Sequence, residues 1–351
     1  MRDNGLAELI RLTRLSSPGS VSGLLLLLLA LVIGFSIALP ASFPTFGTVQ
    51  SMMFQLPELG LLALAMVIPL ISGGINLAII ATTNQCALLM AWVMRAMLSP
   101  ETAGTEAALI VLAALAVGLV YSLVVGSITG YLVATMGVHP ILVTLGTMSL
   151  IDGVSIWLTR GTVISGFPES FQFLGNGTLL GLPVPFLIFV AAAVAIGLVL
   201  TRTAFGISVY MVGSNLEATR YSGVDTRRVI VGIYTLSSVL CFLAAALMAA
   251  RFNSASAGYA QSYLLITILA AVLGGVDPFG GFGRIAGLVT ALIVLQVISS
   301  GFNLLGLSQY LTLAIWGLTL IGVMAVKFFM APVLERAARR PDTPRKESVA
   351  S

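Results

Sequence analysis

Residues 214–228, SNLEATRYSGVDTRR, carry five charged side chains, although only 9% of this 351-residue chain is charged. Ser214 and Glu217 have the spacing of a capping box, in which the serine side chain caps a helix and the glutamate reaches back to it. Gly223 suits the left-handed residue that ends such a helix. The stretch therefore predicts a short capped helix with side chains in fixed positions, which suits docking to a soluble partner rather than catalysis. The alternative interpretation is a solvated loop with a chance cap.

A second group of polar residues interrupts apolar sequence. Asn76 precedes the run TTNQ at residues 82–85, and polar groups inside a bilayer are costly unless they have partners. Asn76 and Thr83 are seven residues apart and share one face of a helix. Such residues either line a path for a polar solute or form hydrogen bonds between helices, worth about 0.6–2 kcal/mol. Asn303 either lines the outer mouth of such a path or caps a helix end. The candidate path residues are Asn76, Thr83, Asn84, Gln85 and Asn303.

Two acidic residues also lie in apolar segments. Glu58 is close to the outer end of its segment, where we expect it at the membrane interface. Asp152 lies deeper, and an unpartnered carboxylate there costs about 2.5–3.5 kcal/mol on insertion scales. Asp152 therefore needs a partner, which the sequence does not identify.

The composition gives no sign of catalysis or metal binding. The sequence has one histidine and two cysteines, and both cysteines lie in apolar segments, where cysteine is usually a small buried hydrophobic residue. No cluster of His, Cys and carboxylate residues could hold a metal, and no nucleophile–base set is present. A GxxxxGK[ST] phosphate-binding loop is also missing. We therefore expect no metal, no cofactor and no enzyme activity in this chain, and any ATP must be hydrolysed by another chain.

These residues are set in a strongly apolar chain, with 58% hydrophobic residues and a mean hydropathy of +1.07. A helix needs about 20 mostly apolar residues to cross a hydrocarbon core roughly 30 Å thick. Because lipid offers the backbone no hydrogen bonds, we predict an all-α, polytopic membrane protein of about ten transmembrane helices. The second and eighth segments are short and end at Gly-Gly pairs. The ten segments are Val21–Leu39, Leu56–Ile71, Ile75–Leu98, Glu106–Met136, Ile141–Thr159, Val184–Thr201, Val229–Ala250, Tyr263–Val276, Ala286–Leu305 and Tyr310–Phe329.

The basic residues predict the orientation. If both chain ends are cytoplasmic, fourteen of the 17 lysines and arginines face the inside and three face the outside, a strong positive-inside bias. The loop 202–228 then also faces the cytoplasm. The predicted organisation is a cytoplasmic N-terminal segment (1–20), a transmembrane domain (21–330) and a cytoplasmic tail (331–351). The net charge of +4 reflects this orientation and contact with anionic lipid, not nucleic-acid binding.

Four motifs, in this order along the chain, resemble one family. PILVTLGTM at 140–148 is similar to a P-F-I-x-T-L-G-T-M segment in the permease subunits of bacterial ABC importers for monosaccharides. RTAFG at 202–206 is similar to an R-T-x-F-G segment of the same subunits. GSNLEATRYSG at 213–223 resembles the cytoplasmic loop of these permeases, which are of the ribose, xylose and galactose type. LGGVDPFGGFG at 273–283 resembles their L-G-G-x-x-x-x-G-G-x-G turn. The resemblance covers residues 55–330.

The resemblance implies the transmembrane permease subunit of an ATP-driven ABC importer in the bacterial inner membrane, with 21–330 as the permease domain and 202–228 as the coupling loop. It implies ABC ATPase subunits that use ATP and Mg, a second permease that is identical or paralogous, and a periplasmic or lipid-anchored solute-binding protein. The short helix would be the coupling helix that docks on the ATPase. The coupling residues are then Ser214, Asn215, Glu217, Ala218, Arg220 and Gly223.

Two departures from the family pattern leave the solute open. Asn76 stands where the family often has aspartate, and Asp152 stands where many members have arginine. Both lie in the predicted membrane region. A monosaccharide or similar small polar solute is the main prediction. The alternatives are a related ABC permease for nucleosides or branched-chain amino acids, and a stand-alone secondary transporter, which would need no ATPase.

Overall fold

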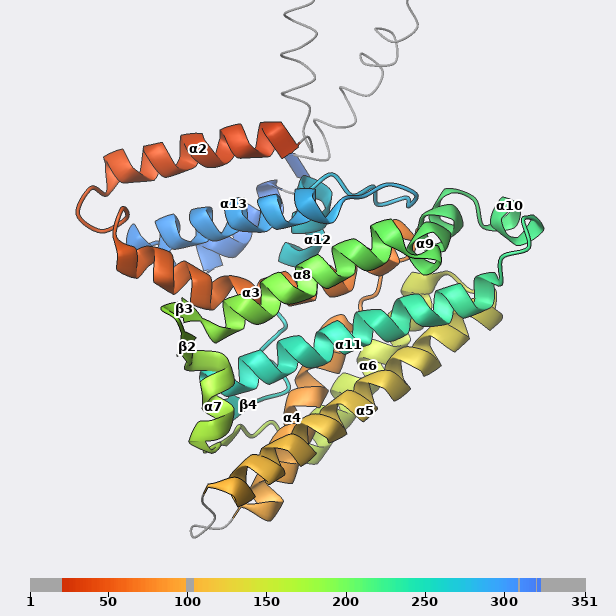
Figure 1. Cartoon of the computed structure of the whole chain (residues 1–351), viewed down its shortest axis with the longest axis horizontal. Helices are drawn as coiled ribbons and strands as arrows, with labels where there is room; N and C mark the ends of the chain where they lie inside the picture. Colours follow the sequence, from red (N-terminus) through yellow and green to blue (C-terminus); the bar gives the residue numbers. More distant parts are fainter. Residues whose placement is uncertain (1–20, 99–103, 309, 320, 323–351) are drawn as a thin grey trace, which may run out of the picture.

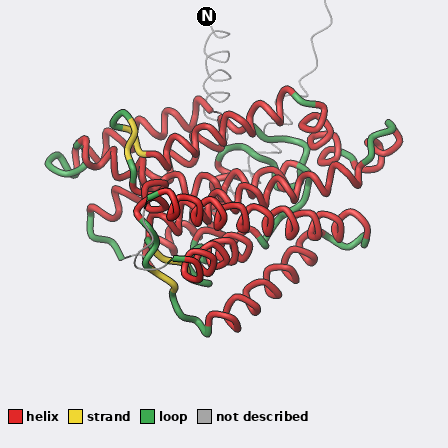
Figure 2. The backbone as a smooth tube through the Cα atoms, turned by 60° about the horizontal axis from the view of Figure 1, so that its bottom comes forward, coloured by secondary structure: helices red, strands yellow, loops and turns green. Residues whose placement is uncertain are grey.

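The computed structural model describes residues 21–98, 104–308, 310–319 and 321–322, and it is built mainly of helices (Figures 1 and 2). The predicted cytoplasmic ends, 1–20 and 331–351, lie outside these residues. Two antiparallel pairs of short strands are β1 (Ile164–Ser165) with β4 (Ser254–Ala255), and β2 (Thr178–Leu179) with β3 (Leu182–Pro183). The helices are α2 (Val21–Ala38), α3 (Phe46–Ile71), α4 (Ile79–Met97), α5 (Thr105–Thr135), α6 (Pro140–Thr159), α7 (Glu169–Asn176), α8 (Val184–Arg202), α9 (Ala204–Ser214), α10 (Leu216–Tyr221), α11 (Thr226–Phe252), α12 (Tyr263–Leu273), α13 (Ile285–Leu304) and a helix over Tyr310–Thr319.

Seven of the described helices are long and apolar enough to cross a membrane: α2, α3, α5, α6, α8, α11 and α13. The chain is therefore an all-α, multi-pass membrane protein, while the full set of ten spans and the side of each terminus stay predictions. Helix α12 has only 11 residues. At 1.5 Å per residue it is about 16 Å long, roughly half the thickness of the hydrocarbon core. This confirms that the eighth segment is short.

Helix α3 differs most from its predicted boundaries. We expect a short segment from Leu56, but the helix begins at Phe46 and has 26 residues. Polar residues before Leu56 and a proline directly after it hide the true start in the sequence. The hydroxyl oxygen of Thr45 caps this helix by accepting a hydrogen bond from the N–H of Thr48 at 3.2 Å. A further helix that the sequence did not predict, α9, follows α8 after Thr203.

Helix α3 lies at the centre of the bundle. Its residues from Leu56 to Ile71 are all buried, and it packs against α8, α11, α12 and α13. Helix α11 also packs against α4 and α5. Figure 1 shows α2 and α13 along one side of the bundle and α5 along the opposite side. The core is thus organised around α3 and α11, which hold the segments that carry the candidate sites.

The two ends of the bundle differ in what they carry. At one end lie α9, α10 and the connection between α12 and α13, and at the other end lie α7, β2 and β3 (Figure 1). We name these the α10 end and the α7 end. The α10 end is the one that the positive-inside bias predicts to face the cytoplasm.

Candidate functional site

The first candidate site is α10 with the segments that hold it. The side-chain oxygen of Asn215 accepts a hydrogen bond from the N–H of Ala218 at 2.9 Å, so Asn215 caps α10. The prediction that Ser214 is the cap is wrong, because α9 continues through Ser214. Asn215 is then the first residue with extended backbone, at φ −162° and ψ 105°. Such a cap is worth about 0.5–2 kcal/mol to its helix.

The other end of α10 stops at the predicted glycine. Gly223 follows the cap residue Ser222 and has a φ of +83°, a left-handed conformation that glycine adopts without strain. Asp225 then caps α11, with one carboxylate oxygen accepting from the N–H of Arg228 at 3.2 Å. The other oxygen pairs with the Arg228 guanidinium at 2.9 Å. Helix α10 is therefore fixed at both of its ends.

The six predicted coupling residues are all exposed. Glu217 in the first turn of α10 and Arg220 in the last turn both favour the helix dipole. Thr219 is buried, and its hydroxyl donates to the carbonyl of Asn215 at 2.7 Å. One face of α10 is thus anchored, while the rest presents charged groups and the 89% exposed side chain of Tyr221.

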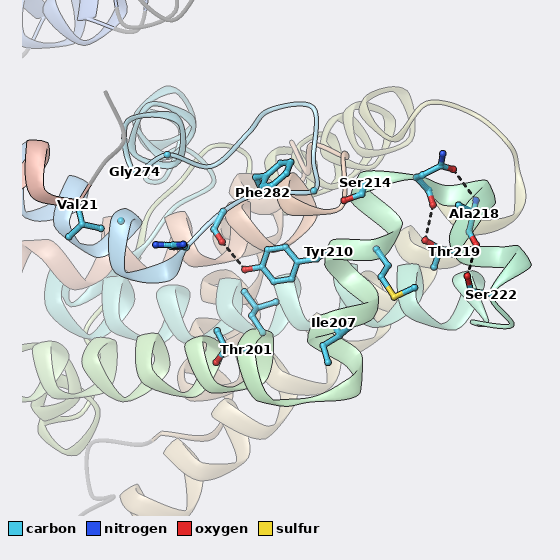
Figure 3. A pocket seen from close by; sticks show the side chains of 18 of the residues that line it. Val21, Thr201, Ile207, Tyr210, Ser214, Ala218, Thr219, Ser222, Gly274 and Phe282 are labelled. Atoms are coloured by element: carbon cyan, nitrogen blue, oxygen red, sulfur yellow. Dashed lines mark hydrogen bonds between the residues drawn. The ribbon is translucent and has the colours of Figure 1, made fainter. Parts of the chain in front are cut away.

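A groove of about 1170 Å³ runs beside α10 (Figure 3). Residues of α9, α10 and the α12–α13 connection line it. The hydroxyl of Tyr210, on α9, donates to the carbonyl of Gly283 at 2.8 Å. Burial raises the pKa of the Tyr210 hydroxyl above its ordinary value. Phe279 and Phe282, on the same connection, are 87% and 71% exposed, which adds aromatic surface beside the charges of α10.

Four glycines join the support of α10 to the centre of the bundle, and we name them the glycine junction: Gly73, Gly213, Gly280 and Gly281. The N–H of Gly281 donates to the carbonyl of Ile71, the last residue of α3, at 2.8 Å. A Cβ atom at Gly213 would overlap that same carbonyl oxygen, and one at Gly280 would lie 2.6 Å from the nitrogen of Gly73. The end of α9, the end of α3 and the α12–α13 connection therefore touch through their backbones, without space for a side chain.

The predicted path residues near α4 are buried and have partners in this chain. The amide of Asn76 donates to the hydroxyl of Ser237 at 3.0 Å, and Thr83 donates to the carbonyl one turn earlier at 2.8 Å. The side-chain oxygen of Gln85 accepts from the hydroxyl of Ser155. These hydrogen bonds favour the packing interpretation over the path interpretation. The assignment of these residues to a substrate path stays a prediction.

Asn84, the remaining residue of this group, stabilises an irregular segment. Its amide nitrogen donates to the carbonyl of Ala257 at 2.6 Å, and its oxygen accepts from the N–H of Ala260 at 3.0 Å. Both partners belong to the segment 253–262, between α11 and α12. Buried backbone polar groups outside helices need hydrogen-bond partners from the protein. Asn84 supplies two of them, a role that sequence spacing alone does not reveal.

Sequence reasoning missed a polar cluster toward the α7 end. The side chain of Glu58 is 1% exposed and lies beside Arg251, so it is enclosed by protein, while its expected place at the membrane interface stays a prediction. Glu58 Oε1 is 3.0 Å from Nη1 of Arg251, and the hydroxyl of Tyr263 donates to Glu58 Oε2 at 3.0 Å. The three residues come from α11, α12 and α3. The sequence signal was a glutamate within one apolar segment and an arginine directly after another.

Asn303 lies near this cluster. It lines a cavity of about 290 Å³ together with Thr48, Ser51 and Ser300. Gln55 lines both this cavity and the cavity around Glu58. A polar lining at the start of α3 and the end of α13 is compatible with a path mouth, and that role of Asn303 stays a prediction.

The partner that Asp152 needs stays unidentified. Its Oδ1 atom is buried and has no hydrogen-bond partner among the described residues, and nothing in the structure explains it. Within the described ranges, no three His, Cys, Asp or Glu side chains gather where they could hold a metal ion.

Comparison with known proteins identifies the family of this chain. Residues 48–324 match the family described as branched-chain amino acid transport system / permease component. The multi-pass bundle is therefore a membrane permease of a transport system. The chain belongs to this family, as the resemblance of its motifs to permease subunits predicted.

Individual relatives are similar over most of the chain. The autoinducer 2 import system permease protein LsrD of Yersinia enterocolitica is 31% identical over 272 residues, which cover 76% of this chain and 79% of that protein. The ribose import permease protein RbsC of Bacillus subtilis is 33% identical over 264 residues, which cover 75% and 79%. No solved structure matches this chain.

Proposed function

We propose that this chain is the transmembrane permease subunit of an ATP-driven ABC importer for a monosaccharide or a similar small polar solute, in the bacterial inner membrane. Membership of the permease family supports the transport role. The relatives named for import of autoinducer 2 and of ribose support the solute class. The family description names branched-chain amino acid transport, so a permease for such amino acids is the second candidate.

The observation that carries the ATPase partnership is the exposed helix α10, capped by Asn215 and ended by Gly223. In this proposal α10 docks on an ABC ATPase subunit, which binds ATP and Mg, while this chain holds no cofactor. When ATP binding draws two ATPase subunits together, α10 moves with them. The glycine junction passes the movement to α3. ATP and solute shift the permease only through their different affinities for its outward-facing and inward-facing states.

The proposal includes two further partners and a topology. A second permease, identical or paralogous, encloses the path with this one, and a periplasmic or lipid-anchored binding protein delivers the solute at the α7 end. Ten transmembrane helices with both termini in the cytoplasm then place the α10 end at the ATPase. A stand-alone secondary transporter would give the capped helix no role.

Co-purification from native membranes tests the docking role. We expect an ATPase to co-purify with the tagged wild-type chain and to be lost in Glu217→Lys, which reverses an exposed charge on α10. Gly223→Val should also weaken docking, because a left-handed conformation costs a residue with a Cβ roughly 1–2 kcal/mol. Glu169→Lys, the same change at an exposed glutamate of α7, is the matched control and should retain the ATPase.

Two outcomes would count against the proposal. Wild-type ATPase binding and uptake in both α10 variants would remove α10 from the docking surface. A folded wild-type chain that never brings down an ATPase would favour the secondary transporter. The path assignment has its own test: Asn76→Ala should lower uptake more than assembly if Asn76 lines the path, and lower assembly if it packs against Ser237.

A further inference from the structure

We propose that the cavity around Glu58 is a solute subsite that holds one neutral polyhydroxylated molecule of monosaccharide size. This inference rests on the proposed import function and gives the solute a place within this chain. The cavity measures about 290 Å³, near the lower end of the range of roughly 300–1,000 Å³ for small-molecule sites. Its polar lining consists of Gln55, Glu58, Arg251, Tyr263, Gln296 and Ser299.

Glu58 has one carboxylate oxygen, Oε1, that is held by an ion pair but accepts no directed hydrogen bond from the described residues. Tyr263 donates to its Oε2 atom at 3.0 Å. Its Oε1 atom is buried and has no hydrogen-bond partner among the described residues, although Nη1 of Arg251 lies 3.0 Å away. That nitrogen donates to the carbonyl of Phe54 at 3.2 Å. The Arg251 cation offsets the charge of this oxygen without giving it a directed hydrogen bond, so a hydroxyl of a bound molecule that donates to Oε1 would add the missing hydrogen bond.

The charge of the cavity selects a neutral ligand. Glu58 and Arg251 are the charged residues that line it, and they form an ion pair. A zwitterionic amino acid would have to separate this pair, which leaves each buried charge short of its partner. A sugar hydroxyl can both donate and accept. It can therefore donate to Glu58 and accept from Arg251 while the ion pair stays intact.

The remaining walls suit a small sugar ring. Nε2 of Gln296 donates to the side chains of Gln55 and Ser300, both at 3.2 Å, so the amides are held in place. Trp316 lines the same cavity and is 3% exposed, which gives the polar groups an apolar aromatic wall. Gln55 also lines the adjoining cavity that contains Asn303. Polar residues thus continue from the subsite toward the start of α3 and the end of α13.

Trp316 provides a local reporter of occupancy. The chain has three tryptophans, so labelling the full-length chain with 5-fluorotryptophan in lipid nanodiscs gives three fluorine resonances, of which Trp316→Phe identifies one. The probes are D-ribose, D-xylose and D-galactose, with L-leucine as the zwitterionic comparison. We expect at least one sugar to shift the Trp316 resonance in a saturable way, and L-leucine to leave it unchanged.

Variants test whether the shift of the Trp316 resonance depends on the proposed contacts. Glu58→Gln should raise the apparent Kd of the active sugar by about tenfold or more, because it removes a charge-assisted hydrogen bond. Gln296→Leu leaves the ion pair untouched and should weaken binding as well. It replaces Glu58→Gln as the test of the subsite if Glu58→Gln fails to fold. Glu169→Gln makes the same chemical change at an exposed residue of α7 and should bind as the wild type does.

A parallel uptake measurement separates this inference from the proposed function. Proteoliposomes contain the wild-type chain with its co-purified ATPase and binding protein. Sugar uptake without a shift at Trp316, or with equal affinity in wild type, Glu58→Gln and Gln296→Leu, would overturn the subsite and leave the importer intact. A shift caused by L-leucine and by none of the sugars would overturn the neutral ligand class. Saturable sugar binding that Glu58→Gln weakens, in a chain that imports no sugar, would uphold the subsite and overturn the proposed function.

Discussion

The interior around α4 and the exposed helix α10 use polar side chains in opposite ways. Asn84 and Gln85 are at most 5% exposed, and each hydrogen-bonds within the chain. In α10, Glu217 and Arg220 are exposed. The side chains of Asn215 and Thr219 instead form hydrogen bonds within the helix and its cap. An unexpected polar residue in an apolar chain therefore indicates that a partner is needed. Whether that partner is inside the chain or in another molecule depends on the fold.

The largest effect that would test this contrast is expected at the glycine junction, where the two regions meet. In Gly213→Val the new side chain would overlap the backbone of Ile71, which cannot rotate away as a side chain can. Overpacking of this kind costs about 1–3 kcal/mol or more, so we expect a lower Tm and a lower yield of folded protein. Gly197→Val on α8 is the control, because a Cβ atom at that position would meet nothing within 4 Å. Equal Tm values for the two variants would mean that the junction is loose.

An effect of similar size is expected for an interior residue. Asn84→Leu leaves the carbonyl of Ala257 and the N–H of Ala260 without their partner. Each unsatisfied buried group costs about 1–3 kcal/mol, which thermal unfolding in detergent should detect. Asn303→Leu, at an exposed position, should stay within about 0.5 kcal/mol of the wild type. Unchanged stability of Asn84→Leu would place Asn84 with the residues that serve an outside partner.

Variants of α10 should behave in the reverse way, with a loss of binding but not of stability. Asn215→Ala removes the cap and costs the local helix about 0.5–2 kcal/mol, so ATPase affinity should fall while the Tm of the permease stays the same. Ser214→Ala should change ATPase affinity much less, because Ser214 does not cap α10. Titration of the ATPase onto reconstituted permease measures the ATPase affinity of both variants. A larger loss in Ser214→Ala would restore the capping box predicted from the sequence.

The smallest effect is expected where α9 meets the α12–α13 connection. Tyr210→Phe removes a single hydrogen bond to the carbonyl of Gly283, worth about 0.5–1.5 kcal/mol. We expect a slight decrease in Tm and a modest decrease in ATP-driven uptake. Tyr131→Phe, at a 62% exposed tyrosine of α5, should change neither. A loss of uptake as large as that of Glu217→Lys would mean that Tyr210 itself belongs to the docking machinery.

Features set by local sequence were the ones that could be predicted. The apolar segments, the short α12 and the left-handed Gly223 depend on residues close together in the chain. The cap at Asn215 could not be predicted, because Ser214 has the capping-box spacing to Glu217. Ser214 does not cap α10, because α9 extends through it. The start of α3 was also hidden, because its first turns mix polar with apolar residues and a proline follows them.

The polar cluster toward the α7 end shows the other limit. Glu58 and Arg251 belong to α3 and α11, and their pairing depends on how two distant helices pack. Each residue alone looked like a charge near a membrane interface. No spacing rule connects residues at this separation, so the ion pair and its cavity became visible only in three dimensions.

The position of the glycine junction on α3 has a mechanical consequence. Side chains between packed helices can change rotamer and absorb small displacements, whereas the backbone-to-backbone contact at Ile71 has little compliance. A displacement of the end of α9 would therefore act on the backbone of α3 directly and not through side chains that can change rotamer. The same helix carries Glu58, about 20 Å away at 1.5 Å per residue, and has Pro57 and Pro69 in its interior. If α10 docks as proposed, a push on it arrives at the end of α3, and Pro69, two residues before Ile71, is the point where the helix can bend instead of moving the carboxylate of Glu58.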